Sequence, residues 1–501
     1  MAASEQTSAP PGAVRETRSG GLRGRTARGT LINAGFMVAF SVIGLVQGVV
    51  VARLLPTDVY GLWGLLMAAF MTLLMLGSVG IDDKYVQQDD VDQQRAFEIA
   101  FTLQLLLGAV FVVVLLVGMP LFAGLYGQPE LIWPGIALAA ALPALAFQMP
   151  LWAHYRRMDF LRQRLLQSID PLVTFVATVT LAIAGLGLWA LVLGALIGTW
   201  VAAAGMVASS PYRLRWRFDR VALRSYRSFS WPLFAAALST AALVQGPALV
   251  GIHFAGITAV AGIALATVIS QFAGRVEGLL TDTMYPAICR VKDRPDLLWE
   301  AFWKSNRLAQ LWAAPLGIAV ALFAGDFVHH VIGEKWRFAV GLIAAYGLTA
   351  AVDQIGFNWT AFFRAIGRTR PMAVQSAIHL AVVSAVALPL LAFEGLTAFG
   401  VGMGVATLVA VVVRLRYLRE IFPGATFAAH AVRGFAPSVP AALAVLALRE
   451  GFPAERGLGR VVAEAVLFVA IAGAATWVLE RRLLRESLAY LTSGRAGGAN
   501  A

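Results

Sequence analysis

A set of polar side chains lies inside apolar segments of this sequence that are long enough to cross a membrane. Such groups are costly in a lipid bilayer, so they usually face the interior of a helix bundle or a water-filled passage. The candidates for the lining of a polar cavity are Asn33, Gln47, Gln104, Gln245, Gln271, Arg275, Asp353, Gln354, Asn358, Gln375 and His379. The alternative for an isolated Asn or Gln is a hydrogen bond that holds two helices together.

The ionisable members of this set carry the strongest functional signal. An ionised group at membrane depth needs a charged partner or water, so Asp353 and Arg275 are candidates for a binding site. Arg275 could instead extend to the cytoplasmic surface. Gln375 and His379 are one helical turn apart and share a face. His379 is a candidate proton site, with a hydrogen-bonded histidine of the bundle as the alternative.

The sequence predicts no catalytic site and no metal site. It contains no Gly-rich phosphate loop, no HExxH zinc motif and no Gly-x-Ser-x-Gly nucleophile motif. The single cysteine, Cys289, excludes an internal disulfide and a cysteine-based metal cluster. The acidic residues between positions 82 and 92 fit a solvated loop better than a metal-dependent sugar-transferase motif. We therefore expect a protein that is not an enzyme and has no cofactor, and whose coupling ion, H⁺ or Na⁺, the sequence leaves open.

The segments that carry these side chains predict an all-α polytopic membrane protein. Of the 501 residues, 59% are hydrophobic and 14% charged, whereas a soluble domain carries about 25% charged residues. A spanning helix needs about 20 mostly apolar residues, and about fourteen such segments are present. We predict spanning helices at 30–53, 60–81, 97–119, 131–152, 169–185, 187–208, 229–252, 256–277, 306–324, 338–358, 371–393, 395–414, 430–448 and 460–480. Two long apolar stretches break at 185–187 and 251–256, and each is predicted to form a helical hairpin.

The distribution of Lys and Arg orients the chain. Most of the 40 basic residues fall in alternate loops, which places both termini in the cytoplasm. The opposite, outer side receives only Arg53, Lys335, Arg337, Arg449, Arg456 and Arg460. The net charge of +12 therefore reflects topology and contacts with anionic lipids rather than nucleic-acid binding.

The same pattern predicts how the chain is organised. The predicted units are a disordered basic cytoplasmic tail (1–28), an N-terminal lobe of six helices (29–210), a basic amphipathic cytoplasmic linker (211–228), a C-terminal lobe of six helices (229–420), helices 13 and 14 (421–482) and a cytoplasmic tail (483–501). The segments 216–229 and 296–308 have the spacing of amphipathic helices that lie on a lipid surface, with a cytoplasmic gate as the alternative.

A weak internal repeat relates the two predicted lobes. An apolar helix end, a short outer turn and a Gly that opens the next helix occur at 51–64 and again at 251–264. Six helices separate the two copies, so the lobes share one orientation. Parallel repeats of this kind are a known transporter arrangement, with the binding site between the repeats.

Several motifs resemble those of Wzx-type polysaccharide flippases. They are VARLLPTDVYGLWGL at 51–65, LGSVGIDDKYVQQ at 76–88, LRSYRSFSWPL at 223–233, YPAICRVKD at 285–293, IGEKW at 332–336 and AIGR at 365–368. Each motif is loose alone, but their order and spacing resemble the family over most of the first twelve helices. The chain is therefore similar to members of the multidrug/oligosaccharidyl-lipid/polysaccharide exporter superfamily.

This resemblance implies two six-helix lobes around a central cavity, plus two C-terminal helices, in the bacterial inner membrane. It implies a flippase that moves polyprenyl-diphosphate-linked oligosaccharide units from the cytoplasmic to the periplasmic leaflet, for assembly of O-antigen, capsule or exopolysaccharide. The implied partners are this lipid-linked oligosaccharide, membrane lipids, a polysaccharide polymerase and a chain-length regulator. Relatives line the cavity with Arg or Lys, whereas here no basic residue lies clearly at mid-membrane, which leaves the diphosphate site open.

Two other classes compete with the flippase. A cation-coupled drug exporter of the same fold is expected to place a carboxylate deep in the N-terminal lobe, where Asn33, Gln47 and Gln104 are all uncharged. A membrane polysaccharide polymerase or ligase is expected to carry a large outer loop rich in Arg and His, and the predicted outer loops are short.

Overall fold

The computed structural model describes residues 19–486 except 78–80, 88–91, 158, 292, 367, 369 and 453–455, and all regular elements in this part are helices. The first half of the chain forms α1 (Ser19–Leu54), α2 (Thr57–Gly77), α3 (Ile81–Gln87), α4 (Gln93–Leu125), η1 (Pro129–Leu131), α5 (Ile132–Ala139), α6 (Ala141–Phe147), α7 (Pro150–Arg156), α8 (Phe160–Ile183) and α9 (Leu188–Ala208). The second half forms α10 (Arg220–Val291), α11 (Pro295–Phe327), η2 (Val328–Ile332), η3 (Glu334–Ala339), α12 (Val340–Asp353), α13 (Trp359–Ala365), α14 (Arg370–Val382), η4 (Val383–Ala387), α15 (Leu388–Glu394), α16 (Leu396–Ile421), α17 (Phe427–Phe435), α18 (Ser438–Gly451) and α19 (Leu458–Leu479). The predicted all-α class is therefore confirmed.

The helices are long and apolar enough for a multi-pass membrane protein. In the described part, 11 helices meet the length and hydropathy needed to cross a bilayer, or 12 if the bent pair α17–α18 is one span. The remaining predicted spans, 229–252 and 338–358, correspond to the arm of α10 before Gly256 and to α12, which has only 14 residues. The number fourteen thus stays a prediction.

Glycines with positive φ make the sharp turns that the sequence predicted. Gly185 and Gly187 have φ of 84° and 55° between α8 and α9, and Gly256 has φ of 74° within α10. Only glycine adopts this region without a steric penalty. The two predicted helical hairpins are therefore present.

Two predictions about the cytoplasmic segments need correction or fall outside the described part. Residues 213–219 form no helix, so the predicted amphipathic helix at 216–229 begins only with α10 at Arg220. The Gln94 side chain donates to the Arg213 carbonyl at 2.8 Å and accepts its N–H at 3.0 Å, which holds the segment against α4. The helix α1 begins at Ser19, within the tail predicted to be disordered, and residues 1–18 and 487–501 lie outside the described residues.

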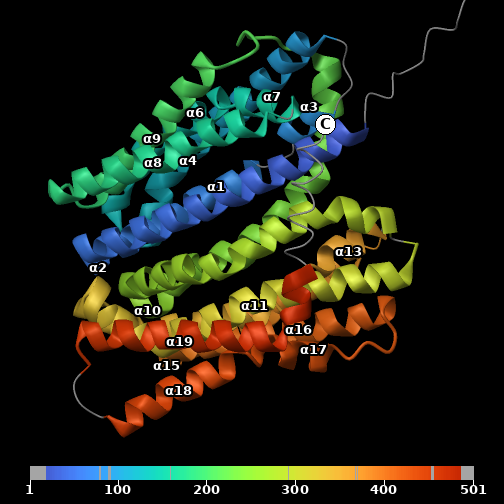
Figure 1. Cartoon of the computed structure of the whole chain (residues 1–501). Helices are drawn as coiled ribbons and strands as arrows, with labels where there is room; N and C mark the ends of the chain where they lie inside the picture. The colour runs from blue at the N-terminus through green and yellow to red at the C-terminus, as the bar shows by residue number, and fades with distance from the viewer. Residues whose placement is uncertain are drawn as a thin grey trace, which may run out of the picture.

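The helices form two groups that meet at one end. In Figure 1, α1–α9 lie together and α11–α19 lie together, while α10 starts beside α3 and runs into the second group. At the left of Figure 1, α2 packs along the part of α10 that follows Gly256. A methyl group on Gly61 would overlap the Ile257 carbonyl oxygen, and one on Gly64 would lie 2.9 Å from the Ala264 Cβ. These contacts join the two copies of the repeat found in the sequence.

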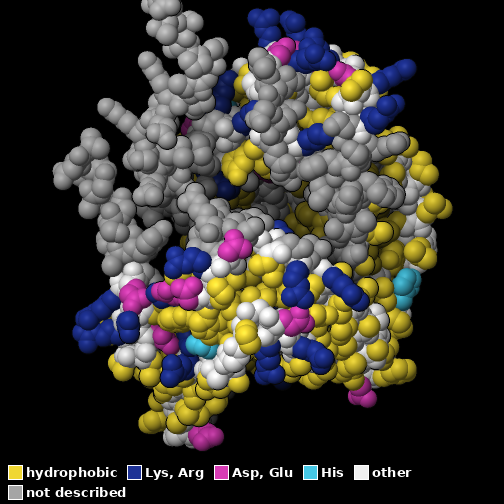
Figure 2. All heavy atoms as spheres, turned by 90° about the vertical axis from the view of Figure 1, so that its right-hand side faces the viewer, with side chains coloured by type: hydrophobic (Ala, Val, Ile, Leu, Met, Phe, Trp, Pro, Cys, Tyr) yellow, Lys and Arg dark blue, Asp and Glu magenta, His cyan; other side chains and the backbone are white. Residues whose placement is uncertain are grey.

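The opposite end of the molecule has a different surface. Figure 2 shows the face at the right of Figure 1, where many Lys and Arg side chains lie at the top and across the lower half. Between the two groups of helices this face is hollowed. The two groups of helices are therefore in close contact at one end of the molecule, and the surface between them is concave at the basic end.

We expect Gly61→Ala to weaken the packed end, because the added methyl has no room against the Ile257 backbone. Overpacking of this kind costs about 1–3 kcal/mol. Thermal unfolding of the purified protein in detergent measures the effect. Gly44→Ala on α1 is the matched control, since the described residues leave open space there. Equal melting temperatures for the two variants would contradict the predicted close contact.

Candidate functional site

The helix α12 ends inside the second group of helices, and a short non-helical segment separates it from α13. The segment covers residues 354–358, and Gly356 has a positive φ of 72°. Non-helical backbone at membrane depth is tolerated where it is buried in protein or lines a water-filled cavity. Broken helices of this kind form substrate sites in many transporters. The predicted site residues Asp353, Gln354 and Asn358 all lie at this break.

A buried arginine from α16 satisfies the end of α12. Arg414 Nη1 donates to the Asp353 carbonyl at 2.6 Å and to the Ile355 carbonyl at 2.9 Å, and Nη2 donates to Asp353 Oδ1 at 2.9 Å. The Arg414 side chain is 8% exposed, whereas that of Asp353 is 49% exposed. The arginine is therefore a fixed support, and the carboxylate is the accessible member of the pair.

Amide and hydroxyl groups from α11 support the other side of the break. With its side-chain amide turned over, the Asn306 oxygen accepts the N–H groups of Gly356 at 2.9 Å and Phe357 at 3.3 Å. The Asn358 amide donates to Ser305 Oγ. Gln354 and Asn358 are 3% and 2% exposed. Both side chains are thus shielded from solvent.

The helix α14 adds a histidine to the same region. His379 is partly buried and lies within electrostatic range of Asp353 and Arg414. Its buried Nε2 has no hydrogen-bond partner among the described residues. Gln375, one turn away on α14, is 9% exposed. A half-exposed carboxylate, a buried arginine and an unpaired imidazole nitrogen together can bind a cation, a proton or the hydroxyl groups of a sugar.

The other predicted site residues lie elsewhere. Gln47 on α1, Gln104 on α4 and Gln245 on α10 are half-buried, and Gln271 on α10 is exposed. None of these four hydrogen-bonds the break at 354–358 in the part of the chain that the structure describes. The side chains of Asn33 and Arg275 lie outside the described residues. Of the predicted site residues, the structure therefore brings together only those of the second half, namely Asp353, Gln354, Asn358, Gln375 and His379.

The sequence analysis missed two charged residues. Arg414 was placed in the cytoplasmic set, but α16 continues to Ile421 and buries it. The signal was a stripe four residues apart on one face of α16, formed by Gly402, Ala406, Ala410, Arg414 and Leu418, all of which are buried.

The second missed residue is a carboxylate in the first half. Asp170 lies on α8, where the Thr174 hydroxyl donates to its Oδ1 at 2.9 Å. A methyl on Gly198 of α9 would lie 2.8 Å from the same oxygen. The expectation that the first half has no deep carboxylate rested on Asn33, Gln47 and Gln104 alone. It overlooked Asp170, which lies near the start of the predicted span 169–185.

The chain is thus a helical membrane bundle whose two halves close at one end, with an ion-paired helix break inside. Solved structures share this fold. The chain is similar to the lipid II flippase MurJ in an inward closed conformation, with TM-score 0.74 and 10% identity over 91% of this chain and 99% of that one. It is also similar to an inward-facing multidrug resistance MATE family transporter of the MOP superfamily, with TM-score 0.65 and 14% identity over 79% of this chain and 100% of that one.

Sequence comparison gives the family. Residues 50–341 match the family described as polysaccharide biosynthesis protein, and the chain belongs to this family. The succinoglycan biosynthesis transport protein ExoT of Rhizobium meliloti (strain 1021) is 21% identical over 364 residues, which are 68% of this chain and 74% of that protein. The suspected family and fold are thereby confirmed.

We expect Arg414→Ala to destabilise the second group of helices, because two backbone carbonyls and the Asp353 carboxylate lose their donor. Hydrogen bonds to charged groups contribute about 1.5–3 kcal/mol each, so a loss of at least about 2 kcal/mol is expected. Arg416→Ala, on the exposed face of the same helix, is the control. Thermal unfolding of both purified variants measures the effect. Equal melting temperatures would contradict the assignment of Arg414 as the donor at the end of α12.

Proposed function

We propose that this protein is a flippase for polyprenyl-diphosphate-linked oligosaccharide units, which it moves from the cytoplasmic to the periplasmic leaflet of a bacterial inner membrane. The observation that carries the proposal is the closure of the two halves at one end together with the hollow at the basic end (Figure 2). By the positive-inside rule the basic end is cytoplasmic. The structure then corresponds to a carrier that receives its substrate from the cytoplasm.

The physical problem of flipping matches this architecture. A diphosphate-sugar headgroup in bare hydrocarbon loses its hydrogen bonds to water, and a charged group there is very costly. A polar passage between two bundles of helices lowers that cost, while the lipid tail stays in the bilayer. In this proposal residues 29–210 and 229–420 form two lobes that rock against each other, and 421–482 form two supporting helices.

The comparisons support the substrate class. The family is named for polysaccharide biosynthesis, ExoT is named as a transport protein of succinoglycan biosynthesis, and MurJ is named as a lipid II flippase. The first two names refer to polysaccharide or succinoglycan biosynthesis, and the last two refer to transport or flipping. The lipid-linked oligosaccharide is thus the proposed substrate, and a polymerase and a chain-length regulator are the proposed protein partners.

Within the passage, Asp353 is the proposed point of contact in the second half. Its half-exposed carboxylate can accept hydrogen bonds from sugar hydroxyls, and Arg414 holds it in place. The polar residues Asn33, Gln47, Gln104, Gln245, Gln271 and Arg275 remain proposed cavity groups from α1, α4 and α10. Gln354, Asn358 and Gln375 are assigned to positioning, and His379 is a candidate for proton coupling.

A cation-coupled multidrug exporter is the second candidate, and one observation favours it. Asp170 provides the carboxylate in the first half that such an exporter needs. The MATE transporters also share the fold. Deletion of the gene separates the two functions, because the flippase and the exporter predict different phenotypes.

We expect deletion of the gene to trap lipid-linked oligosaccharide in the cytoplasmic leaflet and to abolish the corresponding surface polysaccharide. Extraction of lipid-linked glycans, with and without a membrane-impermeant glycan-modifying enzyme added to spheroplasts, measures both amount and sidedness. Normal surface polysaccharide together with increased drug sensitivity would instead identify the exporter.

We expect Asp353→Asn to reduce transport by more than about tenfold, equivalent to about 1.4 kcal/mol, because the amide cannot replace the charge that Arg414 and the substrate share. The protein should be expressed at the wild-type level. Glu394→Gln, an exposed carboxylate at the end of α15, is the control. The measurement is complementation of the deletion strain, scored by polysaccharide yield. Full restoration of the yield by both variants would show that Asp353 is not part of the site.

A further inference from the structure

The outer end of α1 leaves backbone carbonyls that need donors from elsewhere in the chain. A helix frees its last four carbonyls, and the helix dipole adds partial negative charge at this end. Pro56 follows almost directly and has no N–H to offer. The carbonyls of Ala52 and Arg53, and that of Leu55 just beyond the helix, are therefore natural sites for cations and N–H donors.

The donors come from η3, nearly 300 residues later in the sequence. Lys335 Nζ donates to the Arg53 carbonyl at 2.9 Å and to the Leu55 carbonyl at 2.5 Å. Trp336 Nε1 donates to the Ala52 carbonyl at 2.8 Å. The Trp336 ring is fully buried and meets the Tyr60 ring edge to face at 5.1 Å. Two of the six motifs that suggested the family, at 51–65 and 332–336, thus form one contact.

The contact is reciprocal, because α1 also donates to the second half. Arg53 Nη1 donates to the Val331 carbonyl of η2 at 2.5 Å. Every one of these bonds joins the first half of the chain to the second. None of them can persist if the two halves separate at this end.

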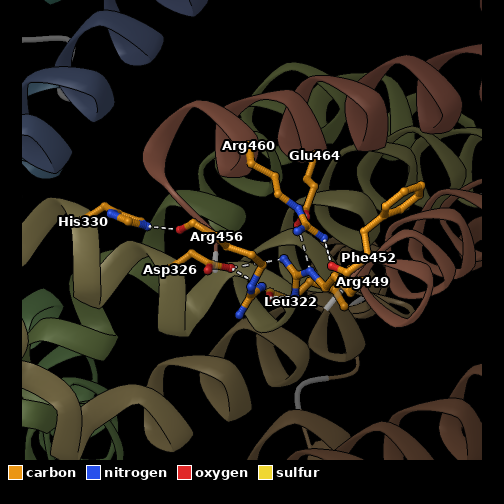
Figure 3. A network of polar contacts seen from close by, with 8 residues as sticks. All are labelled: Leu322, Asp326, His330, Arg449, Phe452, Arg456, Arg460 and Glu464. Atoms are coloured by element: carbon orange, nitrogen blue, oxygen red, sulfur yellow. Dashed lines mark hydrogen bonds and ion pairs between the residues drawn. The ribbon is translucent and has the colours of Figure 1, made fainter. Parts of the chain in front are cut away.

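The base of the contact is braced by α18 and α19. Figure 3 shows Asp326, at the end of α11, which accepts from Arg449 and Arg456 at 3.1 Å each. His330 of η2 donates through Nε2 to the Arg456 carbonyl at 3.0 Å. The segment that carries Val331 is therefore also tied to the C-terminal helices.

A second carboxylate completes this brace. Glu464 of α19 accepts from Arg449 at 2.8 Å and from Arg460 at 3.0 Å (Figure 3). Asp326 and Glu464 are 7% and 0% exposed. Removal of one partner from such a buried group leaves an uncompensated charge, which is strongly destabilising. The brace is thus a rigid support, whereas the contact with α1 consists of donors that can leave together.

We propose that Lys335 and Trp336 form an outer latch, which caps the end of α1 while the passage faces the cytoplasm and releases it when the passage opens outward. The two opening states rest on the proposed function, but the latch contacts do not. Burial, followed by the nearby charge of Arg53, lowers the pKa of the Lys335 ammonium. The cation is therefore held less favourably than in water, which suits a contact that must be released.

A cysteine introduced at a buried position can report whether the latch is closed or released. Ala261, on α10 just beyond the outer turn, is fully buried in the core shared by the two halves. In a Cys289→Ser background, Ala261→Cys should react slowly with a membrane-impermeant maleimide added from outside. Ala144→Cys, fully buried on α6 within the first half, is the reporter for general loosening.

We expect Lys335→Met and Trp336→Phe each to raise the rate of labelling at Ala261→Cys by about tenfold, equivalent to about 1.4 kcal/mol of lost closure. Lys335→Met keeps the aliphatic stem, and Trp336→Phe keeps a ring but loses the N–H. Arg337→Met removes an equal charge from the exposed side of η3 and should leave the rate unchanged.

Unchanged labelling in Lys335→Met and Trp336→Phe would overturn the latch. So would an equal rise at Ala144→Cys, because that result indicates loosening of the fold. Faster labelling at Ala261→Cys in a protein whose deletion leaves lipid-linked glycans unaffected would retain the latch and reject the flippase. The two proposals therefore fail separately.

Discussion

Backbone groups freed at helix ends inside a bilayer must find partners within the protein, and this constraint explains the placement of the important charges. Water is absent from the hydrocarbon core, and an unsatisfied carbonyl there is costly. At the end of α12 the donor is Arg414, and at the end of α1 the donors are Lys335 and Trp336. In both places a side chain from a distant part of the sequence completes a helix. The first of these caps fixes a break within one group of helices, and the second joins the two groups.

The fold was largely predictable from the sequence, because its signals are local. Length, apolar composition and the alternation of basic loops indicate a polytopic helical protein. Gly185, Gly187 and Gly256 stand at the predicted turns, because a reversal between two long helices requires a positive φ. The start of the amphipathic helix predicted at 216–229 failed for a non-local reason. The Thr102 hydroxyl on α4 accepts the Arg217 N–H at 2.9 Å, which competes with helix formation before Arg220.

The site was only partly predictable, because the burial of a side chain depends on which helix packs against it. Asp353 was recognised as an intramembrane charge, but its ion pair with Arg414 joins two helices whose proximity no local pattern reveals. Arg414 reads as one of several basic residues at a helix end until the buried stripe on α16 is considered. The few basic residues assigned to the outer side also looked like exceptions to a rule. Five of the six, all except Arg337, belong to the latch and its brace.

The attachment of residues 213–219 to α4 limits how the two halves can move. The helix α4 has 33 residues and is therefore about 50 Å long, while the hydrocarbon core is about 30 Å thick. Its first turns therefore project beyond the core and carry the connecting segment with them, through Gln94 and the bond from the Arg217 N–H to the Thr102 hydroxyl at 2.9 Å. An ion pair from Arg95 to Asp219 at 2.9 Å fixes the last residue before α10. The connection is therefore fixed to α4 up to Asp219. The rocking of the two halves in the proposed function would have to pivot at the first turns of α10.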